Sequence, residues 1–271
     1  MSYLKNDKPM TLFELGKMRA EGRKITMLTC YDASFAAMLE RADVDTVLIG
    51  DSLGNVIQGQ SSTLPVTLEQ MAYHTECVVR GCKRPFIITD MPFGSYQEGP
   101  EQAMRNAAHL MAAGAQMVKL EGGSHVVDTV RFLVDRGVPV CAHIGLTPQS
   151  VHQLGGYRIQ GKSDSAAAQL KADALALEKA GAAMLVLEMV PAALAAEISA
   201  SLSSMATIGI GAGSECDGQV LVLYDMIGVF PGKKPRFVKD FMEDAGSIEE
   251  AIARFVDDVR QGRFPTDAHS Y

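Results

Sequence analysis

The chain is poor in cysteine, in basic residues and in long apolar runs, and each shortage excludes a class of protein. Its five cysteines, an odd number, form no C-x-x-C pair, so we expect reduced thiols in the cytoplasm rather than disulfides or a zinc site. Lysine and arginine (25) are outnumbered by aspartate and glutamate (32), and the net charge of −7 disfavours nucleic-acid binding. The apolar stretch Ala180–Ala196 is too short to span a bilayer comfortably and contains Glu188 and Pro191, so we expect no membrane segment.

Linkers rich in proline, glycine and serine, low-complexity tracts and internal repeats are also missing from the 271 residues. Hydrophobic residues make up 47% of the chain, which is long enough to bury roughly three quarters of its unfolded surface in a large core. Length alone allows one α/β barrel or two smaller domains. The order of the apolar segments along the chain distinguishes one barrel from two domains.

Eight short apolar runs recur along the chain, and most are separated by segments with helical spacing. The expected strands are Ile25–Thr29, Thr46–Gly50, Phe86–Thr89, Met117–Glu121, Val138–Ala142, Met184–Glu188, Thr207–Gly211 and Val220–Tyr224. The expected helices include Ser34–Arg41, Leu68–Gly81, Pro100–Ala113, His125–Arg136 and Ser165–Ala180. Such alternation predicts parallel pairing, and eight units favour a (β/α)8 TIM barrel over an open sheet with a second domain.

We therefore predict an α/β chain that forms a single barrel domain over residues 1–271. Residues 232–271 are expected to be a C-terminal helical extension, because apolar side chains recur there near helical spacing. These side chains are Phe237, Phe241, Ile248, Ile252 and Phe255.

Polar or ionisable residues stand at the carboxyl ends of most expected strands, where a barrel keeps its catalytic groups. They are Asp51 and Ser52 after the second strand, Asp90 after the third, Lys119 and Glu121 on the fourth, His143 after the fifth and Glu188 at the end of the sixth. In a barrel these groups would meet in one mouth. Unpaired charges there would cost several kcal/mol, so something must compensate them.

Lys119 and Glu121 are two residues apart on a strand, so their side chains share a face, and charge favours the interior mouth. The carboxylates of Asp51, Asp90 and Glu121 together carry −3, which one divalent cation and the Lys119 ammonium would balance. A set of oxygen ligands selects a hard ion, Mg²⁺ before Zn²⁺.

Each candidate also has an ordinary structural explanation. The charged strand ends could be salt-bridged without metal, Asp51 could cap the next helix, and His143 could be a hydrogen-bonded core histidine. For Glu188 this explanation is weak. A carboxylate between Leu187 and Met189 in so apolar a run should have a raised pKa, which suits a general base.

Three loops add weaker signals. The glycines of Gly209–Gly213 are as consistent with tight packing as with anion binding. The connections Asn55–Leu68 and Ile144–Ser163 are longer than usual and are expected to be substrate loops or interface pieces.

These motifs together resemble the ketopantoate (3-methyl-2-oxobutanoate) hydroxymethyltransferase family, from about Thr11 to Tyr271. The matching segments are Ile49–Gly54, Ser62–Thr67, Asp90–Phe93, Met117–Gly123, His143–Ser150 and Gly209–Gly213. The resemblance implies a Mg²⁺-dependent (β/α)8 enzyme with one Mg²⁺ per subunit. It would transfer a hydroxymethyl unit from the co-substrate 5,10-methylenetetrahydrofolate to 3-methyl-2-oxobutanoate. The product, 2-dehydropantoate, would serve pantothenate and coenzyme A biosynthesis.

The resemblance also implies roles for individual residues. It places the metal ligands at Asp51, Asp90 and Glu121, the oxoacid contacts at Asp51, Ser52, Asp90 and Lys119, and the proton acceptor at Glu188. It further implies a homo-oligomer, a homodecamer, in the cytoplasm. The family's usual glutamate before the terminal His-Ser-Tyr is Ala268 here, outside the metal set.

The chemistry of these residue types agrees with this assignment. A 2-oxoacid chelates Mg²⁺, which would stabilise the enolate formed when Glu188 removes the C3 proton. Lys119 and Ser52 would then bind negative charge on the substrate. Two alternatives stay open: a carbon–carbon lyase or phosphonomutase-like barrel without folate dependence, and a non-catalytic metabolite-binding barrel that needs no base.

Overall fold

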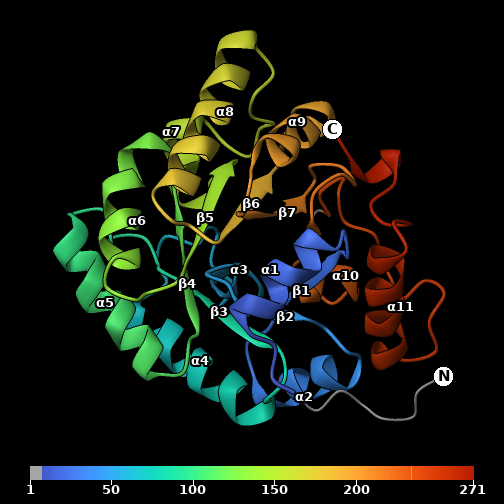
Figure 1. Ribbon diagram of the computed structural model, residues 1–271. Coiled ribbons are helices and arrows are strands. Elements are labelled where there is room, and N and C mark those ends of the chain that lie inside the picture. The colour runs from blue at the N-terminus through green and yellow to red at the C-terminus, as the bar shows by residue number, and fades with distance from the viewer. Residues whose placement is uncertain (1–7, 233) are drawn as a thin grey trace.

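Eight parallel strands close into a barrel with helices around it in the computed structural model, which describes residues 8–232 and 234–271 (Figure 1). The strands are β1 Ile25–Thr29, β2 Thr46–Ile49, β3 Phe86–Asp90, β4 Met117–Glu121, β5 Val140–Gly145, β6 Met184–Glu188, β7 Ala206–Ile210 and β8 Gly218–Leu221. Each strand pairs with the next along the chain, and β8 pairs with β1. The predicted TIM barrel is confirmed.

Helices follow most strands and begin at residues that suit helix starts. The α-helices are α1 Leu12–Ala20, α2 Ala33–Arg41, α3 Leu53–Val56, α4 Leu68–Gly81, α5 Pro100–Ala112, α6 Val127–Val134, α7 Val151–Leu154, α8 Asp164–Lys179, α9 Ala192–Ser201, α10 Leu223–Met226 and α11 Ile248–Arg260. Short 3-10 turns are η1 Ser124–Val126, η2 Pro148–Ser150 and η3 Asp267–His269. Asp32 accepts the first free N–H groups of α2, and Thr67 forms a capping box with Gln70 at α4.

The amino-terminal end of the barrel is covered by α1, which lies across it in the foreground of Figure 1. Leu15 and Met18 are buried on the inner side of this helix, and Arg19 donates hydrogen bonds to the carbonyls of Leu202 and Ser203 just before β7. Helix α11 packs on β1 and α2 and completes the outer ring. The carboxyl ends of the strands are therefore the end at which a ligand site can open.

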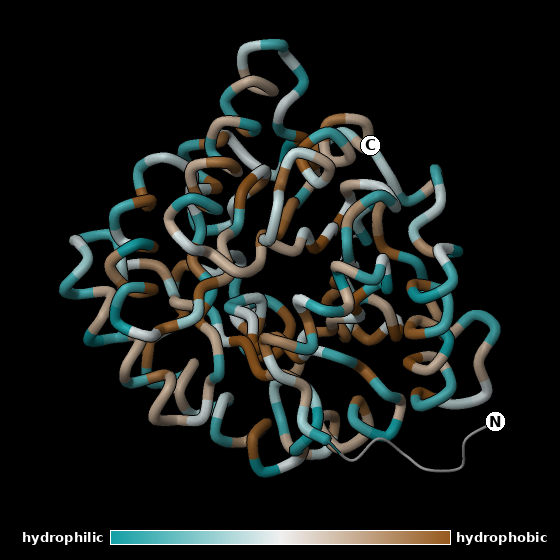
Figure 2. Tube along the Cα trace, viewed as in Figure 1, coloured by the Kyte–Doolittle hydropathy of each residue, from teal (hydrophilic) through white to brown (hydrophobic). Residues whose placement is uncertain are grey.

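The strand residues are buried on both faces, as a parallel sheet beneath a helical layer requires. Hydrophobic residues accordingly gather along the inner segments of the chain in Figure 2, and hydrophilic residues lie mostly at the periphery. Of the described helices, none is long and apolar enough to cross a membrane.

Two expected strands, the fifth and the eighth, differ from the structure by two or more residues at each end. The fifth begins after Pro139, which has no N–H to donate, and runs to Gly145 at φ +93°, so His143 lies within the strand rather than after it. The eighth begins at Gly218, where a Cβ would lie 2.4 Å from the Ile25 carbonyl oxygen. The apolar residues after Leu221 form α10 instead of extending the strand.

The carboxyl-terminal segment is less helical than its apolar spacing predicts. Of the residues described in this segment, only those of α11 and the η3 turn are helical, and Phe237 and Phe241 lie in irregular chain. Phe241 nevertheless packs edge-on against Phe255 of α11, with the ring centroids 5.6 Å apart. The apolar side chains of this segment therefore pack into the same core although they do not all lie on one helix.

Candidate active site

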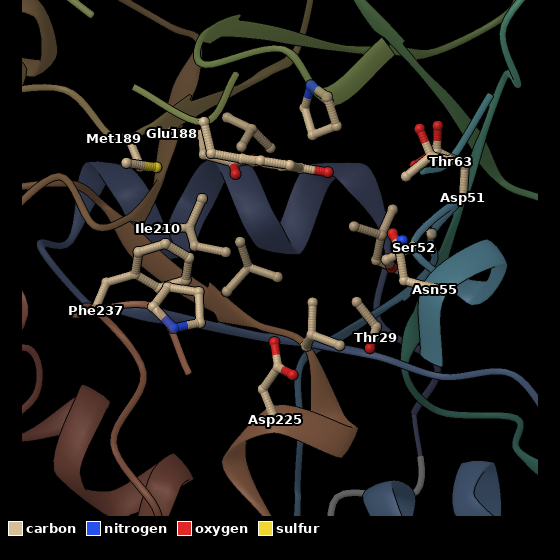
Figure 3. Close-up of a pocket in the computed structure, with 18 of the residues that line it drawn as sticks. Thr29, Asp51, Ser52, Asn55, Thr63, Glu188, Met189, Ile210, Asp225 and Phe237 are labelled. Atoms are coloured by element: carbon tan, nitrogen blue, oxygen red, sulfur yellow. The ribbon is translucent and has the colours of Figure 1, made fainter. Parts of the chain in front are cut away.

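A cavity of about 680 Å³ opens at the carboxyl ends of the strands (Figure 3). Every site residue expected from the sequence lines it: Asp51, Ser52, Asp90, Lys119, Glu121, His143 and Glu188. Their predicted convergence is thus confirmed. The two long connections also reach the cavity, through Asn55 and Thr63 of one and Pro148 and Tyr157 of the other.

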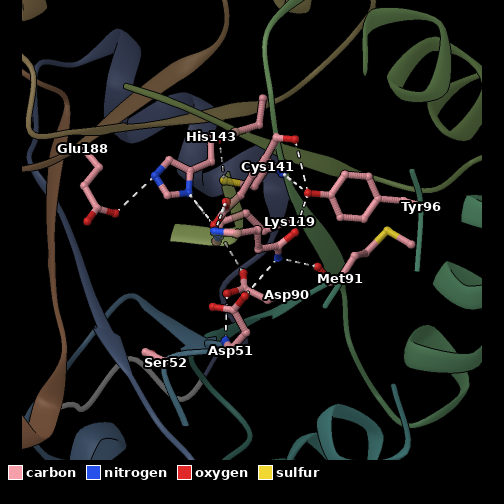
Figure 4. A network of polar contacts seen from close by, with 12 residues as sticks. Asp51, Ser52, Asp90, Met91, Tyr96, Lys119, Cys141, His143 and Glu188 are labelled. Carbon is pink, nitrogen blue, oxygen red and sulfur yellow. Dashed lines mark hydrogen bonds and ion pairs between the residues drawn. The ribbon is translucent and has the colours of Figure 1, made fainter. Parts of the chain in front are cut away.

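Lys119 lies at the centre of the charged groups (Figure 4). Its Nζ is 3.0 Å from Oδ1 of Asp90, 4.0 Å from Oε1 of Glu121 and 3.2 Å from Nδ1 of His143. Lys119 and Glu121 therefore share the interior face, as their spacing predicts. Burial opposes the charged ammonium, but the surrounding carboxylates of Asp90, Glu121 and Asp51 outweigh it and raise the pKa of Lys119.

Gln149, in η2, is the residue of this network that sequence reasoning missed. Its amide nitrogen donates to Oδ2 of Asp51 and to the Met91 carbonyl, both at 2.9 Å, and its amide oxygen accepts from the Tyr96 hydroxyl at 2.7 Å. Its backbone N–H donates to Oε2 of Glu121 at 3.0 Å. The sequence signals for this region were the unusual length of the Ile144–Ser163 connection and the family resemblance of His143–Ser150, and neither singled out Gln149.

His143 links two carboxylates at the wall of the cavity (Figure 4). Its Nδ1 lies 3.4 Å from Oε1 of Glu121 and its Nε2 lies 3.2 Å from Oε2 of Glu188. Burial and Lys119 disfavour a protonated ring, but the contacts with both carboxylates outweigh them and raise the pKa of His143 to about 9. His143 is therefore a buried, ion-paired histidine whose two nitrogens both face carboxylates.

Glu188 lies in different surroundings from those expected. The sequence places this carboxylate in an apolar run, but the side chain faces His143 and is 14% exposed, against 5% or less for Asp90, Lys119, Glu121 and His143. No hydrogen bond from a described residue reaches its Oε1. Glu188 is thus the carboxylate of this group that is most open to a ligand.

Asp51 does not cap a helix, so that alternative is wrong. The residue at the start of α3 is Ser52, and neither it nor Asp51 offers a side-chain cap. The Asp51 backbone N–H donates to Oδ2 of Asp90 at 2.9 Å, which brings the two carboxyl groups together. Burial and the negative charges of Asp90 and Glu121 raise the pKa of Asp51 well above its usual value.

The polar residues suit a divalent cation in charge and donor type. Asp51, Asp90, Glu121 and Glu188 carry −4 when ionised, and Lys119 with a protonated His143 carries +2, which leaves −2. Oδ1 of Asp90 is buried close to Lys119 but has no hydrogen-bond partner of good geometry. Among the described residues, no three histidine, cysteine, aspartate or glutamate side chains are grouped tightly enough to enclose an ion by themselves. Carboxylate oxygens of this kind suit a hard cation that takes few protein ligands and completes its shell with water and substrate.

Ser52 and the glycine-rich loop have different roles around the cavity. The Ser52 hydroxyl lies 2.9 Å from the Tyr31 hydroxyl and lines the cavity beside Asp51. In the loop, Gly211 has φ +63°, and a Cβ there would lie 2.9 Å from the Phe237 ring. A Cβ on Gly213 would lie 2.7 Å from Ala192. The glycines therefore permit close packing, which is the less specific of their two sequence interpretations.

Comparisons with known proteins agree on one family. The profile for ketopantoate hydroxymethyltransferase matches residues 9–267. The chain is 77% identical to the 3-methyl-2-oxobutanoate hydroxymethyltransferase of Azoarcus sp. (strain BH72), over all of both chains. It is 63% identical to the enzyme of that name from Nitrosospira multiformis, over 94% of this chain and 97% of the relative.

Solved structures with a similar fold are more distant in sequence. One is 2,3-dimethylmalate lyase, a PEP mutase/isocitrate lyase superfamily member, with a TM-score of 0.58 and 18% identity over 81% of this chain and 84% of the other. Another is oxaloacetate acetylhydrolase in complex with 3,3-difluorooxalacetate, with a TM-score of 0.60 and 14% identity over 96% of this chain and all of the other. At these identities the likeness shows the barrel fold alone.

Proposed function

The chain belongs to the ketopantoate hydroxymethyltransferase family and acts as a 3-methyl-2-oxobutanoate hydroxymethyltransferase in pantothenate biosynthesis, and from this premise we propose how its cavity performs the reaction. A hydroxymethyl unit passes from 5,10-methylenetetrahydrofolate to C3 of 3-methyl-2-oxobutanoate, which gives 2-dehydropantoate. The observation that carries the mechanism is the position of Glu188, the most open carboxylate of the charged group, with one oxygen beside His143 and the other free.

Glu188 accepts the C3 proton of the oxoacid. Glu188 lines the cavity, its Oε2 lies 3.2 Å from Nε2 of His143, and no described residue donates a hydrogen bond to its Oε1, so the carboxylate has one oxygen open to a substrate. His143 is a positioning residue, because it fixes the carboxylate and touches no reacting atom. The C3–H bond breaks as its electrons form the enolate, and C3 then bonds to the folate methylene carbon. Both bonds from that carbon to the folate nitrogens N5 and N10 break, and these nitrogens take up the C3 proton and one proton of water. Water supplies the hydroxyl oxygen of the product.

Lys119 and Ser52 bind the negative charge of the oxoacid. Lys119 is held in its charged form by Asp90 and Glu121, so it offers a fixed positive charge where the keto oxygen gains negative charge. The Ser52 hydroxyl, beside Asp51, donates to the substrate carboxylate. Asp51 and Asp90 would complete the oxoacid contacts.

One Mg²⁺ per subunit would be held by Asp51, Asp90 and Glu121. When bound, it supplies a Lewis acid that polarises the 2-oxoacid. Asp51 is the most available of the three, because Gln149 donates to its Oδ2 alone. Both oxygens of Asp90 face Lys119 or the Asp51 backbone, and both of Glu121 face His143 or the Gln149 backbone.

The remaining features of the protein are part of the same proposal. One domain spans the chain, with residues 232–271 as its C-terminal part; residues 1–7 lie outside the described residues. All five cysteines are free, which supports a cytoplasmic enzyme. As in the family that it resembles, we expect a homodecamer whose partners are its small-molecule substrates.

Proton NMR in D₂O tests the mechanism. The purified protein is mixed with Mg²⁺, 3-methyl-2-oxobutanoate and 5,10-methylenetetrahydrofolate, beside a sample treated with a chelator. We expect 2-dehydropantoate only when both metal and folate are present. Deuterium entering C3 without this product would instead favour a lyase-like enzyme that uses another electrophile, and no change at all would favour a binding protein.

A further inference from the structure

The cavity is larger than the oxoacid requires. Its volume of about 680 Å³ is typical of sites for drug-sized ligands, whereas 3-methyl-2-oxobutanoate is a five-carbon acid. The charged groups line one end. The other end is lined mostly by apolar and aromatic side chains: Met189, Ile210, Val222, Phe230, Phe237 and Tyr271. Two cationic residues, Lys234 and Arg236, also line it, but Lys234 pairs with Asp240 and Arg236 donates to the Asp267 and Ala268 carbonyls. This apolar end has room for a flat organic ring system.

One carboxylate, that of Asp225, interrupts this apolar end (Figure 3). It comes from α10, directly after β8, and the picture shows it pointing into the cavity. The helix is anchored by the buried side chains of Leu223 and Met226, and the Leu223 N–H donates to the Thr29 hydroxyl at 3.0 Å. The direction of the carboxylate is therefore set by the fold.

Asp225 has no internal partner in the part of the chain that the structure describes. Neither carboxylate oxygen takes part in a hydrogen bond or ion pair there, whereas Asp51, Asp90, Glu121 and Glu188 each face a donor. Burial raises the pKa of Asp225 to about 6, and Lys234 offsets this only in part. An oriented, partly buried carboxylate without a donor is open to a ligand that brings one.

We propose that Asp225 binds the aminopyrimidinone edge of the pterin ring of the folate co-substrate. That edge presents a ring N–H and an amino group side by side, which match the two oxygens of a carboxylate as a guanidinium does. The inference rests on the proposed function, since it assumes that a folate enters this cavity. The flat ring would pack on the apolar wall, where Gly211 lets the chain come close to Phe237 and Tyr271.

The Asp225→Asn variant tests the contact because it keeps the shape of the side chain and removes its charge. We expect KM for 5,10-methylenetetrahydrofolate, and Kd for tetrahydrofolate alone, to rise about 10- to 100-fold, as expected when a charged hydrogen-bond pair is lost. KM for the oxoacid, and deuterium exchange at C3 measured without folate, should change by about twofold or less. Glu215→Gln is a matched control, because this exposed carboxylate lies just before β8 but does not line the cavity.

A folate analogue without the 2-amino group identifies the atoms in contact. It should bind the wild type more weakly than tetrahydrofolate does, yet lose little further affinity in Asp225→Asn, because the variant already lacks the acceptor. A variant that folds and keeps the wild-type Kd for tetrahydrofolate would overturn the inference. So would equal losses of oxoacid and folate binding, which would indicate a structural role. A wild type that forms no 2-dehydropantoate would overturn the proposed function itself.

Discussion

Buried charges are paired at one end of the cavity and unpaired at the other. We call these the charged end, around Lys119, and the apolar end, around Asp225. At the charged end, Lys119, His143 and Gln149 face the carboxylates of Asp90 and Glu121, and few polar atoms lack a neighbour of suitable charge. At the apolar end, no described residue donates a hydrogen bond to Asp225, and the nearby charge of Lys234, which pairs with Asp240, offsets its burial only in part. The first arrangement is preorganised for a small charged ligand, whereas the second is completed only when a ligand supplies donors.

This difference predicts opposite responses to substitution. At the charged end, removing one partner leaves another charge buried and uncompensated, which typically costs about 3–5 kcal/mol. At the apolar end, removing the charge of Asp225 relieves a group that the folded protein solvates poorly. Function and stability should therefore change together where a charge paired with Lys119 or His143 is removed, and in opposite directions at Asp225.

The largest expected effect is the loss of turnover on substitution of Glu188, the residue at the charged end that accepts the substrate proton. Glu188→Gln should keep oxoacid binding but lower both turnover and C3 deuterium exchange about 10³-fold, because an amide does not accept the proton. The assay is the NMR experiment above, with the Kd of 3-methyl-2-oxobutanoate measured by calorimetry. Glu197→Gln, an exposed carboxylate paired with Lys171 on the outer surface, serves as the control. Full turnover in Glu188→Gln would remove the base from the mechanism.

Asp51→Asn tests whether the charged end is built around a cation. The pKa of Asp51 is raised by burial and by Asp90 and Glu121, so without metal the neutral amide should be tolerated, and Gln149 keeps an acceptor. With Mg²⁺, the wild type should gain thermal stability through binding, and the variant should gain little and lose about 10²-fold in kcat/KM. Thermal unfolding with Mg²⁺ and with a chelator measures both. An unchanged Mg²⁺-dependent shift in Tm would show that Asp51 is not a ligand.

The sequence predicted the charged end of the cavity better than the apolar end. Asp51, Lys119 and Glu188 stand at or near strand ends, and the strand ends of any barrel converge. The order of strands and polar residues along the sequence is therefore enough to predict both the fold and the convergence of these side chains. Asp225 was not singled out, because the residues around it look like the end of a strand and not like a short helix facing the cavity. Gln149 was missed because a glutamine in a loop has no chemical signature until its partners are located.

Gln149→Met tests how far the charged end depends on that missed residue. The substitution keeps the side-chain length but removes the hydrogen bonds of the Gln149 amide to Asp51, the Met91 carbonyl and Tyr96. Tyr96 keeps its contacts with the Glu121 backbone, and the Gln149 N–H still donates to the Glu121 side chain. We expect a loss of about 2–4 kcal/mol in unfolding free energy and about tenfold in kcat/KM. Chemical denaturation and steady-state kinetics measure the two effects. Stability equal to wild type would mean that water replaces the amide.

The smallest expected effect is a gain in stability on Asp225→Asn. It distinguishes the apolar end, because substitutions of paired charges at the charged end should lower stability. The pKa of Asp225 in the folded protein, about 6, lies above its ordinary value of 3.8, so the folded state binds this proton more tightly than the unfolded chain. Its contribution to stability therefore falls as the pH rises from about 4 to about 6 and stays low above that. Asp225→Asn should be more stable than wild type by roughly 1 kcal/mol at pH 8, a value reduced for partial exposure to water, and equal to it at pH 4. Urea unfolding of both proteins at the two pH values measures the difference. A variant that is less stable at pH 8 would mean that the carboxylate has a partner in the protein, and the contrast between the two ends would then fail.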